Sequence, residues 1–304
     1  MSVLEAARRA ASRAAAAAGV VVVEVEGTDA QRGTGAVERV FDAIWDTGGA
    51  SVMPDEILRM YALTGQYLSL ACEPDATGAE GAGEVIAASL GLFAAPAGTA
   101  LHSHITGVLP AGLGRAVGYA LKLHQRAWAL ERGIEVVSWT FDPLIRRNAW
   151  FNLGKLAARP VRYLVDFYGA MPDAINAGDA SDRLYLHWQL ASAEVCAALD
   201  RPDGPPVDLL DAAALRRNGF VDLVELAGDG SPSLVGQPSP VSPGALVAIP
   251  ADVEALRRTD LDAALGWRHV VRQALTDALA GGMQISGITR DGYYVLVRAT
   301  QEER

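Results

Sequence analysis

Hydrophobic residues recur with two different periods along this chain, and these periods predict where helices and strands lie. Strong helix formers and apolar residues at spacings of three and four predict helices over 5–18, 37–45 and 54–63. Runs rich in β-branched and aromatic residues predict strands over 20–25, 66–73, 84–93 and 99–109. Three strands therefore follow one another without a helix between them, and the short connection after 66–73 indicates a hairpin.

The second half of the chain alternates between the two periods. It predicts a helix over 116–132 that ends at Gly133, and then the following elements: a strand at 134–140, a helix at 147–158, and strands at 161–168 and 183–190. Proline, glycine and aspartate then become frequent, so we expect a linker over 201–246. A helix over 252–279 and two strands within 283–298 follow. We therefore expect a first domain over 1–200 and a C-terminal α/β extension over 247–304 that packs on it.

Composition narrows the class of protein. The chain has 304 residues, half of them hydrophobic, and a net charge of −10, so we expect neither nucleic acid nor an anionic membrane as a partner. Its alanine-rich N-terminal run is interrupted by Arg8, Arg9 and Arg13, unlike a signal peptide, and no stretch is long enough to span a bilayer. Two distant cysteines fit a reducing compartment and give no metal-ligand spacing. We expect a cytoplasmic protein without a metal.

The stretch "PAGLGRAVGYA" at 110–120 carries the first candidate chemistry. A glycine-rich turn before a helix presents unpaired N–H groups and the positive end of the helix dipole to an anion. Gly112, Gly114 and Gly118 resemble a dinucleotide fingerprint, which favours an NADP-type oxidoreductase. Arg115, Gly118 and Ala120 instead match the pyrophosphate loop of acyl-CoA-dependent transferases. A tight turn that binds nothing is the third interpretation. The run of strands before the loop disfavours the dinucleotide interpretation.

Two further stretches, Trp-Thr-Phe-Asp-Pro-Leu at 139–144 and Ser-Asp-Arg at 181–183, extend the match to the transferase loop. With them the chain resembles the GNAT superfamily of N-acetyltransferases, over roughly residues 20 to 190, and in particular a less-studied branch. The resemblance implies a mixed, mostly antiparallel central sheet with flanking helices, to which the C-terminal helix and hairpin are an extension. It also implies transfer of an acetyl or succinyl group from coenzyme A to a small-molecule amine, because some relatives in this branch are linked to N-succinylation of amino acids.

The resemblance also implies which residues meet the acyl-CoA. A backbone N–H near Val108 or Leu109 would stabilise the oxyanion, and the amides from Gly112 to Tyr119 would hold the pyrophosphate. Lys122 is either a phosphate contact or a solvated surface residue, and Asn148 is either a contact or a helix start. The full set of candidate cofactor-binding residues is Val108, Leu109, Gly112, Gly114, Arg115, Ala116, Val117, Gly118, Tyr119, Ala120, Lys122 and Asn148.

The general base and acid are less clearly marked. His102 and His104 alternate on one strand and so point to one face, where His104 is the preferred base and His102 a substrate contact; both are also compatible with structural roles. Glu73 and Glu84 are backup bases or surface carboxylates. The tyrosine that many superfamily members use as an acid is replaced here by Leu153. That acid is therefore absent, unnecessary or replaced by Tyr163 or Tyr168.

Three more residues are candidates for the acceptor side. Asp142 precedes a proline, so it is a turn residue, a contact to the acceptor amine or a brace for the loop. Asp182 and Arg183 either bind an acceptor carboxylate or form a buried ion pair. The favoured interpretation is an acyltransferase, and a homodimer is compatible with the sequence. A non-catalytic protein of the same fold that binds acyl-CoA or regulates a partner is the alternative.

Overall fold

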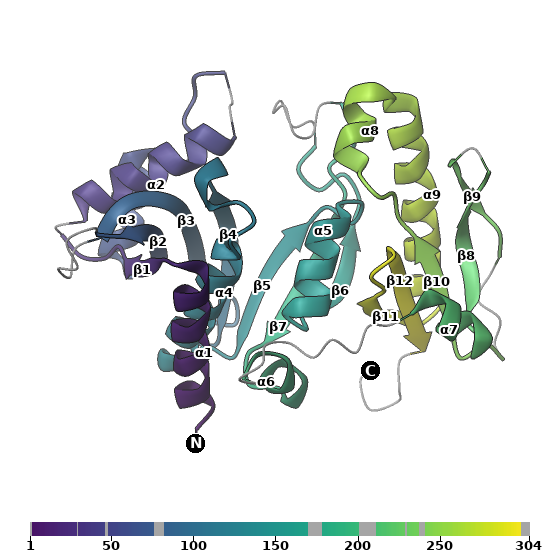
Figure 1. Cartoon of the computed structure of the whole chain (residues 1–304), viewed down its shortest axis with the longest axis horizontal. Helices are drawn as coiled ribbons and strands as arrows, with labels where there is room; N and C mark the ends of the chain where they lie inside the picture. Colours follow the sequence, from purple (N-terminus) through teal and green to yellow (C-terminus); the bar gives the residue numbers. More distant parts are fainter. Residues whose placement is uncertain are drawn as a thin grey trace. The chain divides into compact units, whose positions relative to one another are not determined.

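The computed structural model describes residues 2–28, 30–45, 48–75, 82–169, 178–200, 211–228, 230–236 and 241–298. It divides into two compact units (Figure 1). The first unit comprises 1–139 and 189–204, and the second comprises 140–188 and 205–304. Among the described residues, no helix combines the length and the hydropathy that crossing a membrane requires.

The first unit is built on strands that the chain lays down in sequence order. The order is β1-β2-β3-β4-β5, antiparallel up to β4, and β4 pairs with β5 in parallel. The strands are β1 (Val21–Glu24), β2 (Tyr67–Pro74), β3 (Ala82–Ala94), β4 (Ala100–Val108) and β5 (Val136–Phe141). This is not the strand–helix alternation of a doubly wound sheet, so the dinucleotide interpretation of the glycine loop loses its structural context.

Helices cover both faces of these strands. They are α1 (Val3–Ala18), α2 (Gln31–Ile44), α3 (Asp55–Leu63), the 3₁₀ turn η1 (Pro110–Gly112), α4 (Val117–Glu131) and α6 (Ala193–Leu199). Gly107 faces Ile44 of α2, whereas the next residue, Val108, faces Gly118 of α4. Neighbouring strand residues point to opposite faces, so α2 and α4 cover opposite faces of β4. A core that includes Val37, Phe41 and Leu90 fills the α2 side.

The second unit contains a strand pair and a separate sheet. β6 (Arg159–Leu164) pairs antiparallel with β7 (Arg183–Gln189). The sheet has the order β11-β12-β10-β8-β9, in which only β10 and β8 are parallel. Its strands are β8 (Val221–Leu226), β9 (Pro232–Leu234), β10 (Gly244–Ala248), β11 (Met283–Ile288) and β12 (Tyr293–Arg298). The helices are α5 (Arg146–Ala149), the π-helical turn η2 (Trp150–Lys155), α7 (Ala212–Arg217), α8 (Val253–Thr259) and α9 (Leu261–Ala280).

The predicted fold class, mixed α/β with mostly antiparallel sheets and flanking helices, is confirmed. The described part of the predicted linker forms α7, β8 and β9, because β8 gains hydrogen bonds from β10, a strand that begins near the end of the linker and continues past it. The division into units also differs from the expected boundary at residue 200. The segment with η2 and β6 packs against β11, so it groups with the C-terminal strands.

Candidate functional site

Four backbone N–H groups of the glycine loop and the start of α4 have no hydrogen-bond acceptor among the described residues. After η1 the chain passes through Gly114 and Ala116, both left-handed with φ 77° and 62°, and α4 begins at Val117 without a side-chain cap. Within the described part of the chain, the N–H groups of Gly114, Ala116, Val117 and Gly118 donate to no acceptor. Together with the dipole of α4, they form a site that favours an anion.

Arg115, a candidate phosphate contact, braces this loop. Its guanidinium makes two bonds to the carboxylate of Glu73, at 2.5 and 3.2 Å, and donates to the carbonyls of Ala18 and Gly19 at 3.1 Å. Hydrogen bonding to Arg115 lowers the pKa of Glu73. Glu73 is thus a paired carboxylate that fixes the loop to the ends of α1 and β2, and this engagement weakens its case as a base.

Next to the loop, the edge of β4 that faces β5 is no longer paired with β5. The β4–β5 register runs from Ala100 to His102 on β4, although β4 continues to Val108. On the other edge, Leu109 N donates to Ile86 O at 2.8 Å. Because amides alternate between the two edges of an antiparallel strand, the N–H groups of Val108 and Thr106 point toward the side of β5. Val108 is therefore the stronger of the two oxyanion candidates, since the Leu109 amide is already engaged.

Lys122 lies where β4 and β5 separate. Its side chain is buried, with the residue 7% exposed, so it is not the solvated surface residue of one interpretation. Its Nζ donates to Ser103 Oγ at 2.7 Å and to Gln125 Oε1 at 3.2 Å, and lies 4.1 Å from the ring centroid of Trp139. Burial lowers the pKa of Lys122 to about 7. Ser103 and Gln125 were not predicted as site residues, although the spacing of Gln125 on the helix would have placed it beside Lys122.

His102 and His104 lie close together beside this position. Their ring centroids are 6.3 Å apart, and His102 Nδ1 lies 3.2 Å from Ser138 Oγ. The β3–β4 register shifts between Gly91↔Ser103 and Leu90↔Ile105, so His104 is the extra residue of a β-bulge and the regular alternation ends there. Burial, then His104 and Lys122, lower the pKa of His102 to about 4, and burial lowers that of His104. Both rings are neutral at pH 7 and able to accept a proton.

Glu84, the other backup base, borders a hollow of about 260 Å³. Its lining is Ala36, Arg39, Val40, Glu84, Val85 and Leu109. Glu84 is exposed, so its carboxylate is available to a ligand in this hollow.

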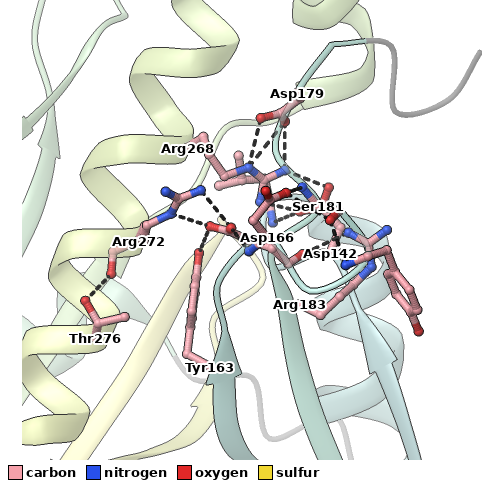
Figure 2. A network of polar contacts seen from close by, with 12 residues as sticks. Asp142, Tyr163, Asp166, Asp179, Ser181, Arg183, Arg268, Arg272 and Thr276 are labelled. Atoms are coloured by element: carbon pink, nitrogen blue, oxygen red, sulfur yellow. Dashed lines mark hydrogen bonds and ion pairs between the residues drawn. The ribbon is translucent and has the colours of Figure 1, made fainter. Parts of the chain in front are cut away.

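In the second unit, Asp142 belongs to a buried ion cluster rather than to an open site. Arg257 and Arg268 both bind Asp142 and Asp179, at 2.5 to 2.8 Å for the closest contacts, and all four side chains are at most 4% exposed. Asp142 also accepts from Leu144 N at 2.9 Å. Arg268 reaches from α9 toward these carboxylates (Figure 2). The sequence prediction missed the arginines and Asp179, because their partners are far away in sequence.

The remaining candidates surround this cluster. Asp182 is buried. It accepts two hydrogen bonds from Arg272, at 2.7 and 2.8 Å, and one from Tyr163 Oη at 2.6 Å. These contacts correspond to the buried ion pair rather than to a free carboxylate. Arg183 donates to the Asp182 carbonyl and lies over the ring of Tyr168, 5.2 Å from its centroid. Tyr168 is exposed, and its hydroxyl lies 3.0 Å from Thr140 Oγ1.

Two predicted positions have weaker ties to these clusters. Asn148 is half-buried on α5, and its N–H donates to Ile145 O. Leu153 is buried in the π-helical turn η2. Among the described residues, no group of three or more His, Cys, Asp and Glu side chains is placed to hold a metal ion.

Comparison with known proteins gives a likeness in structure alone. No family model and no curated sequence matches the chain. Among solved structures, the ribosomal-protein-S18-alanine N-acetyltransferase of Escherichia coli has a TM-score of 0.43 at 10% identity, over 57% of this chain and 96% of its own. A GNAT family acetyltransferase from Elizabethkingia anophelis with acetyl-CoA bound has 0.39 at 12%, over 56% and 98%. The IAA acetyltransferase of Bacillus cereus has 0.39 at 14%, over 56% and 99%.

Proposed function

We propose that this protein is an acyl-CoA-dependent N-acyltransferase. The observation that carries the proposal lies within the first unit. The four free amides of Gly114, Ala116, Val117 and Gly118 lead directly to the open edge of β4. A pyrophosphate needs the first feature, and an extended arm with amide groups can pair with the second, as an added strand does.

The reaction is direct attack of the acceptor amine on the thioester carbonyl carbon. A carbon–nitrogen bond forms, the carbon–sulfur bond breaks and the thiolate leaves with the electron pair. His104 is the proposed base because it lies on the β4 bulge with part of its surface exposed, while partial burial lowers the pKa of its ring. The Val108 amide, next to the loop, would pair with the extended arm, and an outward amide of β4 nearer His104 would stabilise the oxyanion. The donor is an acetyl or succinyl thioester, and the acceptor is a small amine, such as an amino acid.

A second candidate is a protein of the same fold that binds acyl-CoA without turnover. By the resemblance, Leu153 stands where many superfamily members have the tyrosine acid, and the hydroxyl of Tyr163 donates to Asp182. The loop and the β4 edge serve this function equally well. Turnover with an amine separates the two candidates.

The loop is tested by a charge placed among its amides. A Cβ at Gly118 meets only Val108 Cγ2, at 3.8 Å, so a side chain fits there. An acidic residue also suits the first turn of a helix. Gly118→Glu should fold normally and weaken coenzyme A binding about 30-fold through like-charge repulsion with the pyrophosphate.

The control is Gly118→Gln, which has the same bulk without the charge and should retain binding. Binding is measured as the shift in melting temperature with coenzyme A, acetyl-CoA, succinyl-CoA and NADP. Equal binding by the Glu and Gln variants, or a shift of the unsubstituted protein with NADP alone, would contradict the proposal.

A further inference from the structure

Among the described residues, the charge of Lys122 has no counter-ion. Its three contacts are the Ser103 hydroxyl, the Gln125 amide oxygen and the face of Trp139, and none of these is an anion. No carboxylate of the described residues forms an ion pair with it. A buried cation without an anion is unfavourable, so the group either becomes neutral or waits for an anion that the chain itself does not supply.

Gln125 supplies a second unsatisfied donor at the same place. It is fully buried, its Oε1 accepts from Lys122, and its Nε2 has no hydrogen-bond partner. Lys122 and Gln125 are three residues apart on α4, so their side chains share a face. Opposite Nε2 stands Gly91, where a Cβ would lie 3.2 Å from that nitrogen. The packing at Gly91 is tight, since a Cβ there would also lie 3.1 Å from Leu101 Cδ2 and 3.4 Å from His102 O. An anion that reaches both Lys122 Nζ and Gln125 Nε2 would satisfy both donors.

The position along β4 of Ser103, to which Lys122 donates, indicates what the anion is. Ser103 is the first residue of β4 beyond its last pair with β5, and Trp139 is the first on β5. The rise from Val108 to Ser103 is about 16 Å, which matches an extended pantetheine arm. A coenzyme A whose pyrophosphate lies on the loop amides therefore brings its thioester close to Ser103.

We infer that Lys122, Gln125 and Ser103 bind a carboxylate at the far end of the acyl group, so that the donor is the coenzyme A thioester of a dicarboxylic acid. This inference rests on the proposed function, since it takes the donor to be an acyl-CoA. A carboxylate of the acceptor would have the same chemistry, and donor binding in the absence of any acceptor separates the two sources.

The test is a binding titration of the full chain, without acceptor, using succinyl-CoA and butyryl-CoA. Both acyl groups have the same number of carbons, and only one carries a carboxylate. The expected result is at least about 10-fold tighter binding of succinyl-CoA, as for a charge-assisted hydrogen bond. Lys122→Met should remove this preference and leave butyryl-CoA bound. Equal affinities in the unsubstituted protein, or a preference that survives Lys122→Met, would overturn the inference.

A second variant guards against loss of the fold. Gln125→Glu has nearly the same shape and places a carboxylate beside Lys122, so it should fold and should also lose the preference for succinyl-CoA. The outcomes separate the two proposals. If neither coenzyme A nor any thioester binds, the proposed function fails. If coenzyme A and butyryl-CoA bind and the carboxylate adds nothing, the inference alone fails.

Discussion

The two units bury charge in opposite ways. In the second unit, Asp142 and Asp179 meet Arg257 and Arg268, and every carboxylate has two guanidinium partners. In the first unit, Lys122 is comparably buried, and its contacts among the described residues are all neutral groups. Burial removes the solvation of charge in both places, but only the second unit replaces it with opposite charge.

This difference separates a structural role from a binding role. The ion cluster joins α8 and α9 to the segments that carry Asp142 and Asp179, so its charges fix the positions of elements. It uses up its own hydrogen-bonding capacity and leaves little for a ligand. The charge of Lys122 does not pair with a carboxylate of another described element, so it does not hold elements together. Its environment favours a ligand that carries a negative charge.

The largest expected effect comes from removing one arginine of the cluster. Arg268→Met leaves Asp142 and Asp179 buried with one cation between them, and should lower the free energy of unfolding by about 3–5 kcal/mol. Urea denaturation measures this value. The matched control is Arg147→Met, which removes an exposed ion pair with Glu254 and should change little. A similar small loss for both variants would mean that the cluster does not stabilise the second unit.

Removing Lys122 should have the opposite sign. Lys122→Met replaces an uncompensated charge by an apolar side chain of similar length, and should raise the free energy of unfolding at pH 6 by about 1–3 kcal/mol. Urea denaturation at several pH values measures the difference from the unsubstituted protein. A less stable variant at pH 6 would show that the charge of Lys122 is compensated after all.

The gain from Lys122→Met should also depend on pH. Burial lowers the pKa of Lys122 to about 7 in the folded chain, and the unfolded value is about 10.4. Between these values the unfolded chain binds more protons, so the unsubstituted protein becomes more stable as pH rises, by at most about 1.4 kcal/mol per pH unit. The advantage of the variant should therefore shrink above pH 7. A constant advantage from pH 6 to pH 9 would contradict this account.

The preference for succinyl-CoA should fall with pH for the same reason. A carboxylate needs the ammonium form of Lys122, so the affinity ratio of succinyl-CoA to butyryl-CoA should fall up to about 10-fold per pH unit above pH 7. The titratable neighbours His102 and His104 have lowered pKa values and are neutral throughout this range. Titrations at pH 7, 8 and 9 measure the ratio. A ratio that does not change would argue against Lys122 as the partner.

The smallest effect concerns the backbone, where the two units differ again. Ala116 is left-handed in the loop without side-chain support, so Ala116→Gly should raise the free energy of unfolding by about 0.5–1 kcal/mol. Asp166 is also left-handed, but its carboxylate accepts from Ser181 N and Ser181 Oγ. Asp166→Gly should therefore destabilise the chain. Urea denaturation of the two variants measures both signs, and equal signs would contradict this distinction.

Local patterns in the sequence predicted most of the first unit. Its helices and strands follow from periodicity and caps, such as Ser2 with Glu5 at the start of α1 and Gly19 at its end. The predicted helix over 252–279 is two helices, because Asp260 caps the second one by accepting from Ala263 N. The strands β8 and β9 were missed, since their sequence is rich in turn residues and their hydrogen bonds come from distant partners.

The candidate site divides in the same way. The glycine loop and Lys122 were identifiable because spacing along one helix places them. Three other features depend on contacts between segments far apart in sequence. They are the absence of acceptors for the loop amides among the described residues, the bulge at His104 and the pairing of Arg115 with Glu73. The sequence could not indicate that Lys122 lacks a counter-ion, because that requires knowing every neighbour.

Proton uptake on binding tests the central claim, that the charge of Lys122 is completed by the acyl donor. Calorimetric titrations at pH 8, in buffers of different ionisation enthalpy, give the number of protons bound with each thioester. We expect succinyl-CoA to take up close to one proton more than butyryl-CoA, and Lys122→Met to remove this difference. The same proton uptake for both thioesters in the unsubstituted protein would contradict the account.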